Sequence, residues 1–138
     1  MKLKTEITVR YAETDQMGIA HHSVYPIWYE VGRTEFANQI GMNYSNIEKQ
    51  GILMPLVEVH CKFYMPAHYE DVLIIETEVS KLTPARIIFE YNVINKKTGD
   101  LLSTGSTMHG WVGKDLKPLN LKKHFPEIYE KFNSCIDE

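Results

Sequence analysis

The chain has 138 residues, 43% of them hydrophobic, and this size and composition predict one domain, residues 1–138, with a substantial core. Its formal net charge of −3 argues against a nucleic-acid-binding protein, which usually carries a basic surface. No apolar run reaches the roughly 18 residues of a membrane span, and the start MKLKTEITVR lacks the apolar core of a signal peptide, so we expect a cytoplasmic protein.

Apolar and polar residues alternate through the first segment of the chain. Lysine, glutamate, threonine and arginine occupy one phase of the alternation. The other phase holds Leu3, Thr5, Ile7, Val9 and Tyr11. A period of two is typical of a strand with one buried face. The pattern therefore predicts a first strand in which these five side chains, Tyr11 included, share the inward phase.

A helical period replaces this alternation after residue 23. Apolar residues recur near helical spacing, at Val24, Ile27, Trp28, Val31, Phe36 and Ile40. Ser23 is a suitable N-cap, Pro26 is tolerated in a first turn, and Gly41 is a natural stop. We therefore expect one long helix with Ile27 and Val31 on its apolar face.

The remainder of the chain predicts a short helix and four more strands. Ser45 and Glu48 have the spacing of a capping box, and Gly51 follows as a terminator. Strand patterns occupy residues 57–63, 73–79, 87–93 and 101–112. The last strand is rich in Ser, Thr and Gly, which let a helix or a neighbouring backbone approach closely. Five strands and one dominant helix predict an α+β fold, an antiparallel sheet curled around the helix.

A polar loop that contains Asp15 precedes the expected long helix. A helix N-terminus has unpaired N–H groups and a partial positive charge, so it favours an anion or a developing oxyanion. Acyl transfer needs a base or nucleophile on one side of a carbonyl and hydrogen-bond donors on the other. The loop and the helix start together supply both, although a turn or cap role for Asp15 is the simpler alternative.

The same stretch carries a family signature. In order, its residues are Tyr11, Thr14, Asp15, Gly18, His22, Tyr25, Glu30 and Arg33. Their order and spacing resemble the hot-dog-fold acyl-CoA thioesterases related to 4-hydroxybenzoyl-CoA thioesterase. Nearly the whole chain takes part, since VEVHCKFYMPAHYEDVLIIETEV resembles the second and third strands of that family and DLKPLNL its closing segment. Many members have Asp-Ala-Gly-Gly where this chain has Asp15-Gln16-Met17-Gly18, so Gln16 and Met17 are expected to reshape the acyl pocket.

The resemblance implies an activity and a set of site residues. The activity is hydrolysis of a fatty or aromatic acyl-CoA, or of an acyl carrier protein thioester, without a cofactor. Asp15 would act as general base or nucleophile, and the backbone N–H near His22 would polarise the carbonyl oxygen. Tyr11, Gly18 and Tyr25 would contact the substrate. Unpaired sheet edges and the resemblance both predict a homodimer or homotetramer, with the ligand site near the subunit interface.

Positive charge is concentrated near the end of the chain. The segment from Lys114 to His124 holds four lysines against one aspartate. A solvated surface tail is one interpretation, and a binding place for the phosphates of CoA is the other. On the second interpretation Arg86, at the start of a strand, acts together with Lys114 and Lys117.

No metal site is predicted. The residues that come nearest to a ligand cluster are Glu13, Asp15, His21 and His22. Neighbouring histidines point in different directions, however, and an HExxH pattern is missing. The two cysteines, Cys61 and Cys135, lack metal-ligand spacing and do not suggest a disulfide framework.

Two other catalytic patterns are missing from the sequence. The string GSTMHG holds Ser106 and His109 but is not the G-x-S-x-G nucleophile elbow, and its strand alternation favours packing. A hot-dog dehydratase or hydratase would act on the same acyl carriers, but its Asp-x-Asn-Pro-x-His pattern is missing. A non-catalytic acyl-CoA-binding or assembly module is the remaining alternative.

Overall fold

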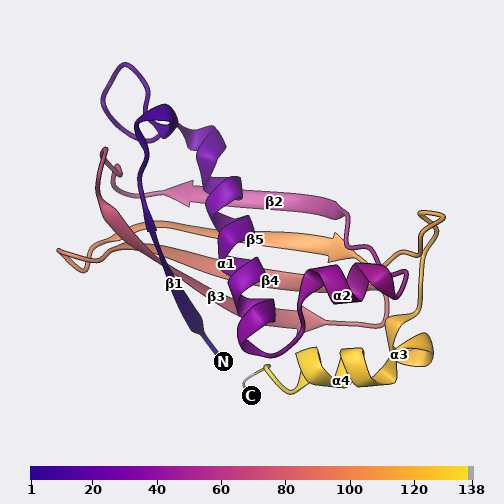
Figure 1. Cartoon of the computed structure of the whole chain (residues 1–138). Coiled ribbons are helices and arrows are strands. Elements are labelled where there is room, and N and C mark those ends of the chain that lie inside the picture. Colours follow the sequence, from indigo (N-terminus) through magenta and orange to yellow (C-terminus); the bar gives the residue numbers. More distant parts are fainter. Residues whose placement is uncertain (137–138) are drawn as a thin grey trace.

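The computed structural model describes residues 1–136 and shows a five-stranded antiparallel sheet curved around one long helix, α1 (Tyr25–Gln39) (Figure 1). The order of strands in the sheet is β1-β3-β4-β5-β2. The strands are β1 (Leu3–Thr8), β2 (Leu56–Phe63), β3 (Val72–Leu82), β4 (Arg86–Asn95) and β5 (Leu101–Gly110). The predicted α+β architecture, with five strands around one dominant helix, is confirmed.

Shorter helices surround this unit. They are the 3₁₀ helices η1 (Tyr11–Glu13) and η2 (His22–Val24) and the α-helices α2 (Tyr44–Lys49), α3 (Leu121–His124) and α4 (Pro126–Asn133). Helix α2 was predicted, but its cap is Asn43, whose side chain accepts the Ser45 N–H, and not a Ser45–Glu48 box. Within residues 1–136 no helix is long and apolar enough to cross a membrane.

Helices α3 and α4 were not predicted, because the lysine-rich segment resembles a surface tail. Leu121 is nevertheless fully buried, and α4 buries Ile128 and Phe132. The ring of Phe132 lies 5.9 Å from that of Trp111, just beyond β5. The end of the chain therefore docks on the core through a few apolar residues, while Lys122 and Lys123 stay exposed.

The two ends of α1 match the sequence signals only in part. Pro26 lies in the first turn, and Gly41 follows the last turn with φ +79°, both as expected. The prediction that Ser23 caps α1 is wrong, because η2 comes first and Val24 occupies the N-cap without a side-chain hydrogen bond. The chain therefore enters α1 through a tighter 3₁₀ turn.

The buried face of α1 is rotated from the predicted one. Ile27 and Val31 are 50% and 37% exposed, while Tyr29 is fully buried. Contact with small residues explains the rotation: a Cβ atom on Gly32 would overlap Thr77, and one on Gly105 would overlap the Tyr29 ring. The small residues of β5 thus permit close approach of the helix, as the sequence suggested.

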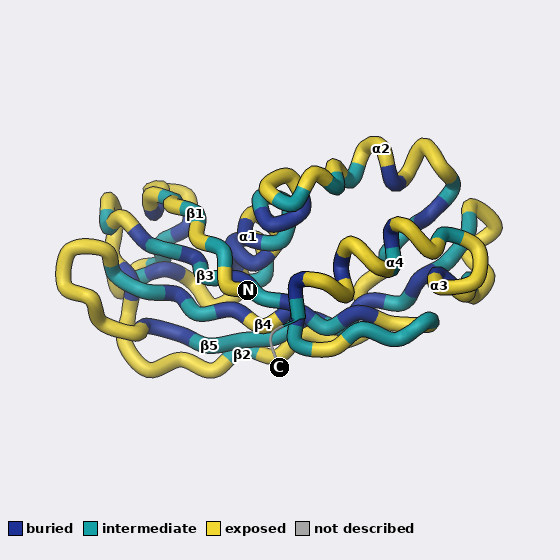
Figure 2. Tube along the Cα trace, turned by 90° about the horizontal axis from the view of Figure 1, so that it is seen from below, coloured by how far each residue is buried: buried dark blue, intermediate teal, exposed yellow. Residues whose placement is uncertain are grey.

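The strand β2 and the residue Tyr11 are both exposed. The edge strand β2 is exposed along its length apart from half-buried Cys61 (Figure 2), and Val57, Val59 and Phe63 are 50%, 40% and 48% exposed. Tyr11 is 76% exposed, so the prediction that it continues the inward phase is wrong. Strand β1 ends before it, and the 3₁₀ turn of η1 takes Tyr11 out of phase.

Candidate active site

Asp15 lies in the loop between η1 and η2, and backbone hydrogen bonds hold that loop closed. The Asp15 N–H donates to the Ile19 carbonyl (2.9 Å), and the Gly18 N–H donates to the Asp15 carbonyl (3.0 Å). Gly18 has φ +79°, which a side chain would strain. The Met17 N–H donates to Oδ1 of Asp15 (2.8 Å). Within residues 1–136 the other carboxylate oxygen, Oδ2, accepts no hydrogen bond.

The start of η2 offers a backbone donor beside this loop. The imidazole of His21 accepts the Ser23 N–H (3.2 Å), and the His21 carbonyl accepts the Val24 N–H (3.1 Å). The backbone N–H of His22 pairs with no acceptor in the described part of the chain. Its side chain is exposed and packs against the ring of His21, with centroids 4.1 Å apart and the ring planes tilted by 34°. An unpaired donor at a helix start is suited to an oxyanion.

Asp15 and His22 border the same open cavity of about 350 Å³. Tyr25, at the start of α1, also lines it, and burial raises the pKa of this phenol, so the hydroxyl is neutral at neutral pH. The structure thus brings together three residues predicted from the sequence. Two further wall residues, Phe63 and Met65, were missed, although the apolar run at the end of β2 was a usable signal.

A second depression, on the other side of Asp15, is bordered by Tyr11 and Gly18. The exposed ring of Tyr11 meets Tyr69 edge to face, with centroids 5.6 Å apart. Asp15 therefore lies between an apolar cavity and an open depression with aromatic walls. Tyr11 and Gly18, which were predicted to contact the substrate, therefore border the second depression and not the cavity that His22 and Tyr25 line.

The predicted phosphate-binding residues lie at the other end of the sheet. Phe63, the last residue of β2, borders the Asp15 cavity, whereas the first residue, Leu56, pairs with His109. Arg86 pairs with Gly110 at that far end. The lysine loop that carries Lys114 and Lys117 follows β5 at the same end, and Lys114 packs near Gly51. Within one chain, then, Arg86 and the lysines do not reach the Asp15 cavity.

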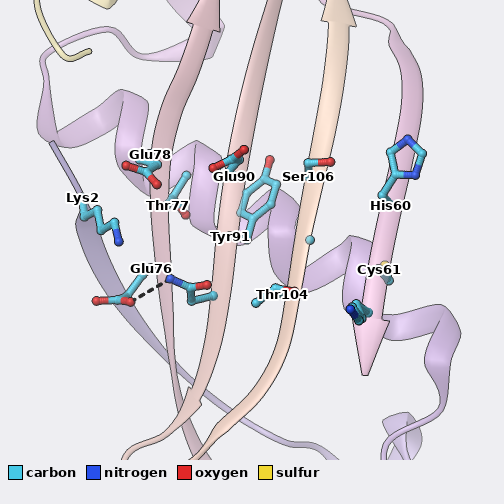
Figure 3. A pocket seen from close by; sticks show the side chains of 13 residues that line it. Lys2, His60, Cys61, Glu76, Thr77, Glu78, Glu90, Tyr91, Thr104 and Ser106 are labelled. Atoms are coloured by element: carbon cyan, nitrogen blue, oxygen red, sulfur yellow. Dashed lines mark hydrogen bonds between the residues drawn. The ribbon is translucent and has the colours of Figure 1, made fainter. Parts of the chain in front are cut away.

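A third depression, of about 400 Å³, lies on the outer face of the sheet, away from α1 (Figure 3). Its floor is polar, and Glu78 and Glu90 lie directly opposite each other on neighbouring strands. Asn92 donates to Glu76 (3.2 Å) on the same face. In residues 1–136 no group of three or more His, Cys, Asp or Glu residues could hold a metal ion. The Asp15 cavity is the better candidate for acyl chemistry.

Comparison with known proteins points to one family. The model of the thioesterase-like superfamily matches residues 9–132. A putative acyl-CoA thioesterase of Bacillus subtilis, YneP, is 38% identical over 132 residues, which cover 93% of this chain and 95% of that protein.

Solved structures agree with this match. A DHNA-CoA thioesterase from Staphylococcus aureus superposes with a TM-score of 0.92 at 34% identity, covering 96% of this chain and 89% of that one. A 1,4-dihydroxy-2-naphthoyl-CoA thioesterase from Synechocystis superposes with a TM-score of 0.83, covering 96% and 98% of the two chains. Its identity is 18%, so that likeness concerns the fold alone. The arrangement of sheet and helix is the hot-dog fold expected from the sequence.

Proposed function

The chain belongs to the thioesterase-like superfamily, and on that basis we propose that it hydrolyses the thioester of an acyl-CoA to a free acid and CoA. The position of Asp15 carries this proposal. Its carboxylate borders an apolar cavity at the helix start, where the backbone N–H of His22 has no acceptor among the described residues. A substrate carbonyl placed between them would meet a base or nucleophile on one side and a donor on the other.

In the proposed reaction an oxygen atom bonds to the carbonyl carbon, and the carbon–sulfur bond breaks with its electron pair on the CoA thiolate. Asp15 either activates the attacking water or attacks the carbonyl itself, after which water releases it. Oδ1 is engaged by the Met17 N–H, so Oδ2 is the oxygen available for this role. The His22 N–H stabilises the charge that develops on the carbonyl oxygen. A thiol pKa of about 8.5 lets the thiolate leave without a strong general acid.

Aromatic side chains favour an aromatic acyl group over a fatty one. The rings of Tyr25 and Phe63 meet edge to face with centroids 4.8 Å apart, and both line the cavity. Aromatic groups gain from such contacts beyond their buried area, whereas an alkyl chain gains from the area alone. The S. aureus relative, named for DHNA-CoA, is consistent with this choice. The depression bordered by Tyr11 and Gly18 then holds the pantetheine arm of CoA.

We place a second copy of the chain along β2. An exposed apolar sheet edge is usually paired with another strand. Strand β2 is such an edge, with Leu56, Val57 and Phe63 about half exposed. The opposite edge, β1, is shorter, with six residues against the eight of β2. Antiparallel pairing of two β2 strands makes a homodimer with one continuous sheet, and two dimers could join as a tetramer.

This pairing also solves the separation between Asp15 and the predicted phosphate ligands. In an antiparallel pair the Leu56 end of one β2 strand lies beside the Phe63 end of the other. Arg86, Lys114 and Lys117 of the second copy are thereby carried toward the Asp15 cavity of the first. The site then needs two copies, one to supply the reacting carboxylate and the other to bind the phosphates of CoA.

Release of free thiol from a panel of thioesters tests the proposed activity. The panel contains 1,4-dihydroxy-2-naphthoyl-CoA, benzoyl-CoA, palmitoyl-CoA and an acyl carrier protein thioester. We expect fastest release from an aromatic acyl-CoA. Hydration of an enoyl-CoA without thiol release would favour a hydratase, and tight binding of acyl-CoA without any turnover would favour a binding module.

Mixing two defective chains tests whether the site is shared. One chain carries Asp15→Asn and the other carries Lys114→Ala with Lys117→Ala. In a shared site, each mixed dimer has one fully native site and one doubly defective site. The Michaelis constant of the mixed dimers should then return to the wild-type value, with about half the wild-type turnover per dimer. If each site belongs to one chain, mixing restores nothing.

A further inference from the structure

We propose that Glu13 is a positioning residue, which holds the Asp15 loop in register with the start of α1. The inference rests on the proposed thioesterase function but concerns a residue outside the family signature. Glu13 lies two residues before Asp15, yet it is 4% exposed while Asp15 faces solvent-accessible cavities. Burying a carboxylate costs free energy unless hydrogen-bond donors or a positive charge compensate it, so Glu13 must have such partners.

Three donors converge on this carboxylate. The Arg10 backbone N–H donates to Oε1 (2.8 Å), and the Trp28 indole N–H donates to Oε2 (3.0 Å). The Arg10 guanidinium also donates to Oε2 (3.3 Å). Burial acts to raise the pKa of Glu13, but these donors outweigh it and hold the pKa below its usual value. Glu13 is therefore a charged group whose oxygens are already occupied, which makes a direct catalytic role unsuitable.

The three bonds tie Glu13 to two partners, Arg10, which is the N-cap residue of η1, and Trp28. Arg10 belongs to the segment that follows β1, and Trp28 belongs to the first turn of α1. The backbone of Glu13 adds a third tie, because its carbonyl accepts the His21 N–H (2.8 Å). His21 is the N-cap of η2. Glu13 thus links the segment after β1, the N-cap of η2 and the first turn of α1.

The geometry relates these ties directly to the reacting groups. Asp15 follows Glu13 by two residues, and the His22 N–H follows His21 by one, so Glu13 sets the separation between base and oxyanion donor. Trp28 extends the connection, because its ring packs 4.6 Å from that of Tyr25, which lines the cavity. A displacement of about 1 Å between reacting groups can cost about 100-fold in rate.

Glu13→Gln is the most direct variant. An amide has one acceptor oxygen, so its NH₂ group must face either the Arg10 N–H or the Trp28 N–H, both of which are donors. We expect kcat to fall about 10- to 100-fold with the Michaelis constant within about threefold of wild type. Assays well below the melting temperature keep every variant folded. The double variant with Trp28→Phe removes the opposing donor and should recover part of the lost kcat.

Tyr91→Phe is the matched control. It removes a buried hydroxyl that bonds to Thr107 at 2.6 Å, remote from the loop. It should lower the melting temperature about as much as Glu13→Gln but leave kcat unchanged. Equal loss of kcat in the two variants would reduce Glu13 to a general stabilising residue and overturn the proposal.

Amide hydrogen exchange separates this inference from the proposed activity. In Glu13→Gln the amides of Asp15, Gly18 and His21 should exchange at least about tenfold faster, while the amides of β3 and β4 keep the wild-type rates. This readout needs no substrate, so it stands even if the protein hydrolyses none of the thioesters tested. Unchanged exchange in the loop, or equal acceleration in loop and sheet, would contradict the positioning role.

Discussion

The helix–sheet interface has a polar cluster at each of two places, and the clusters behave in opposite ways. Near the helix start, Asp15 and His22 border open cavities and retain an unused acceptor and an unused donor. Deeper in the interface, Tyr91, Thr107 and His109 are each at most 2% exposed. Polar groups near the helix start are therefore available to bind a ligand, whereas those of the buried cluster are not.

The buried cluster is a linear chain of hydrogen bonds from Tyr91 through Thr107 and His109 to the Met54 carbonyl. Nδ1 of His109 lies 3.2 Å from the Met54 carbonyl, which can only accept, so Nδ1 carries the hydrogen. Nε2 then accepts from the Thr107 hydroxyl (2.9 Å), and Thr107 accepts from Tyr91 (2.6 Å). Burial, with the Arg33 guanidinium nearby, lowers the pKa of His109 to about 4. This histidine is neutral at neutral pH, with both ring nitrogens in use.

This difference shows that a reactive site is recognised by polar groups whose donors or acceptors have no partner within the protein. A satisfied buried network stabilises and orients the core, whereas spare hydrogen-bonding capacity beside a cavity can be used on a substrate. The expectation that the GSTMHG string serves packing fits this distinction, since His109 is fully enclosed.

Asp15→Asn should give the largest effect on kcat. A small effect would contradict the distinction between a reactive open site and a structural buried cluster. The amide keeps the size of the side chain but loses the charge of a base or nucleophile, so kcat should fall by about 100- to 10,000-fold. The melting temperature should change little, because Asn suits a turn about as well as Asp. Thiol-release kinetics and thermal unfolding of one purified variant check both. A kcat within about threefold of wild type would remove Asp15 from the mechanism.

Acid should destabilise the protein through His109. The pKa of His109 is about 4 in the folded state and about 6.5 when unfolded, so below pH 6.5 the unfolded chain binds the extra proton. The stability that neutral His109 contributes is complete above pH 6.5. It falls as the pH drops toward 4, by about 3 kcal/mol in total.

Urea unfolding at several pH values measures this loss. His109→Gln cannot titrate, so the difference in unfolding free energy between wild type and variant should shrink by about 3 kcal/mol on acidification to pH 4. The other five histidines are exposed and serve as the internal background in both proteins. If the difference in unfolding free energy does not depend on pH, then His109 accepts a proton in the folded state as readily as in the unfolded state.

Gly105→Ala should test how tightly the helix must approach the sheet beside the buried cluster. A Cβ atom there would overlap Tyr29, whose ring stacks on Tyr91 with centroids 4.4 Å apart. We expect a loss of about 1–3 kcal/mol in unfolding free energy, because the ring must move. Gly110→Ala, on the same strand, is the matched control, since its Cβ would lie 3.8 Å from Val57 and meet nothing closer. Equal stability of the two variants would contradict the close packing.

The smallest effects are expected at the far end of the sheet. Arg86→Ala, Lys114→Ala and Lys117→Ala should each raise the Michaelis constant for acyl-CoA by about two- to tenfold, with kcat nearly unchanged. The increase should shrink as salt is added, because exposed charges are screened. Lys131→Ala, exposed on α4, is the control. If all three variants match it at low salt, these residues form only a solvated surface.

Local features of the fold were readable from the sequence because their signals involve neighbouring residues. Alternation located β3, β4 and β5, Pro26 and Gly41 marked the bounds of the long helix, and small residues on β5 predicted close helix packing. The placement of Asp15 in a loop just before the helix also followed, since residue spacing and helix termini are properties of one short segment. The catalytic role of Asp15 stays a prediction.

Tertiary structure decided which of these local faces is covered. Ile27 and Val31 have helical spacing, but the contact of Gly32 with Thr77, 45 positions along the chain, turns them outward. Glu13 looks like any polar loop residue until Trp28 reaches its carboxylate. The separation of Arg86 from Asp15 follows from the strand register, which pairs Arg86 with Gly110 at the far end of the sheet and which no local pattern encodes. Periodicity specifies the faces of an element, whereas burial depends on partners that only folding brings into contact.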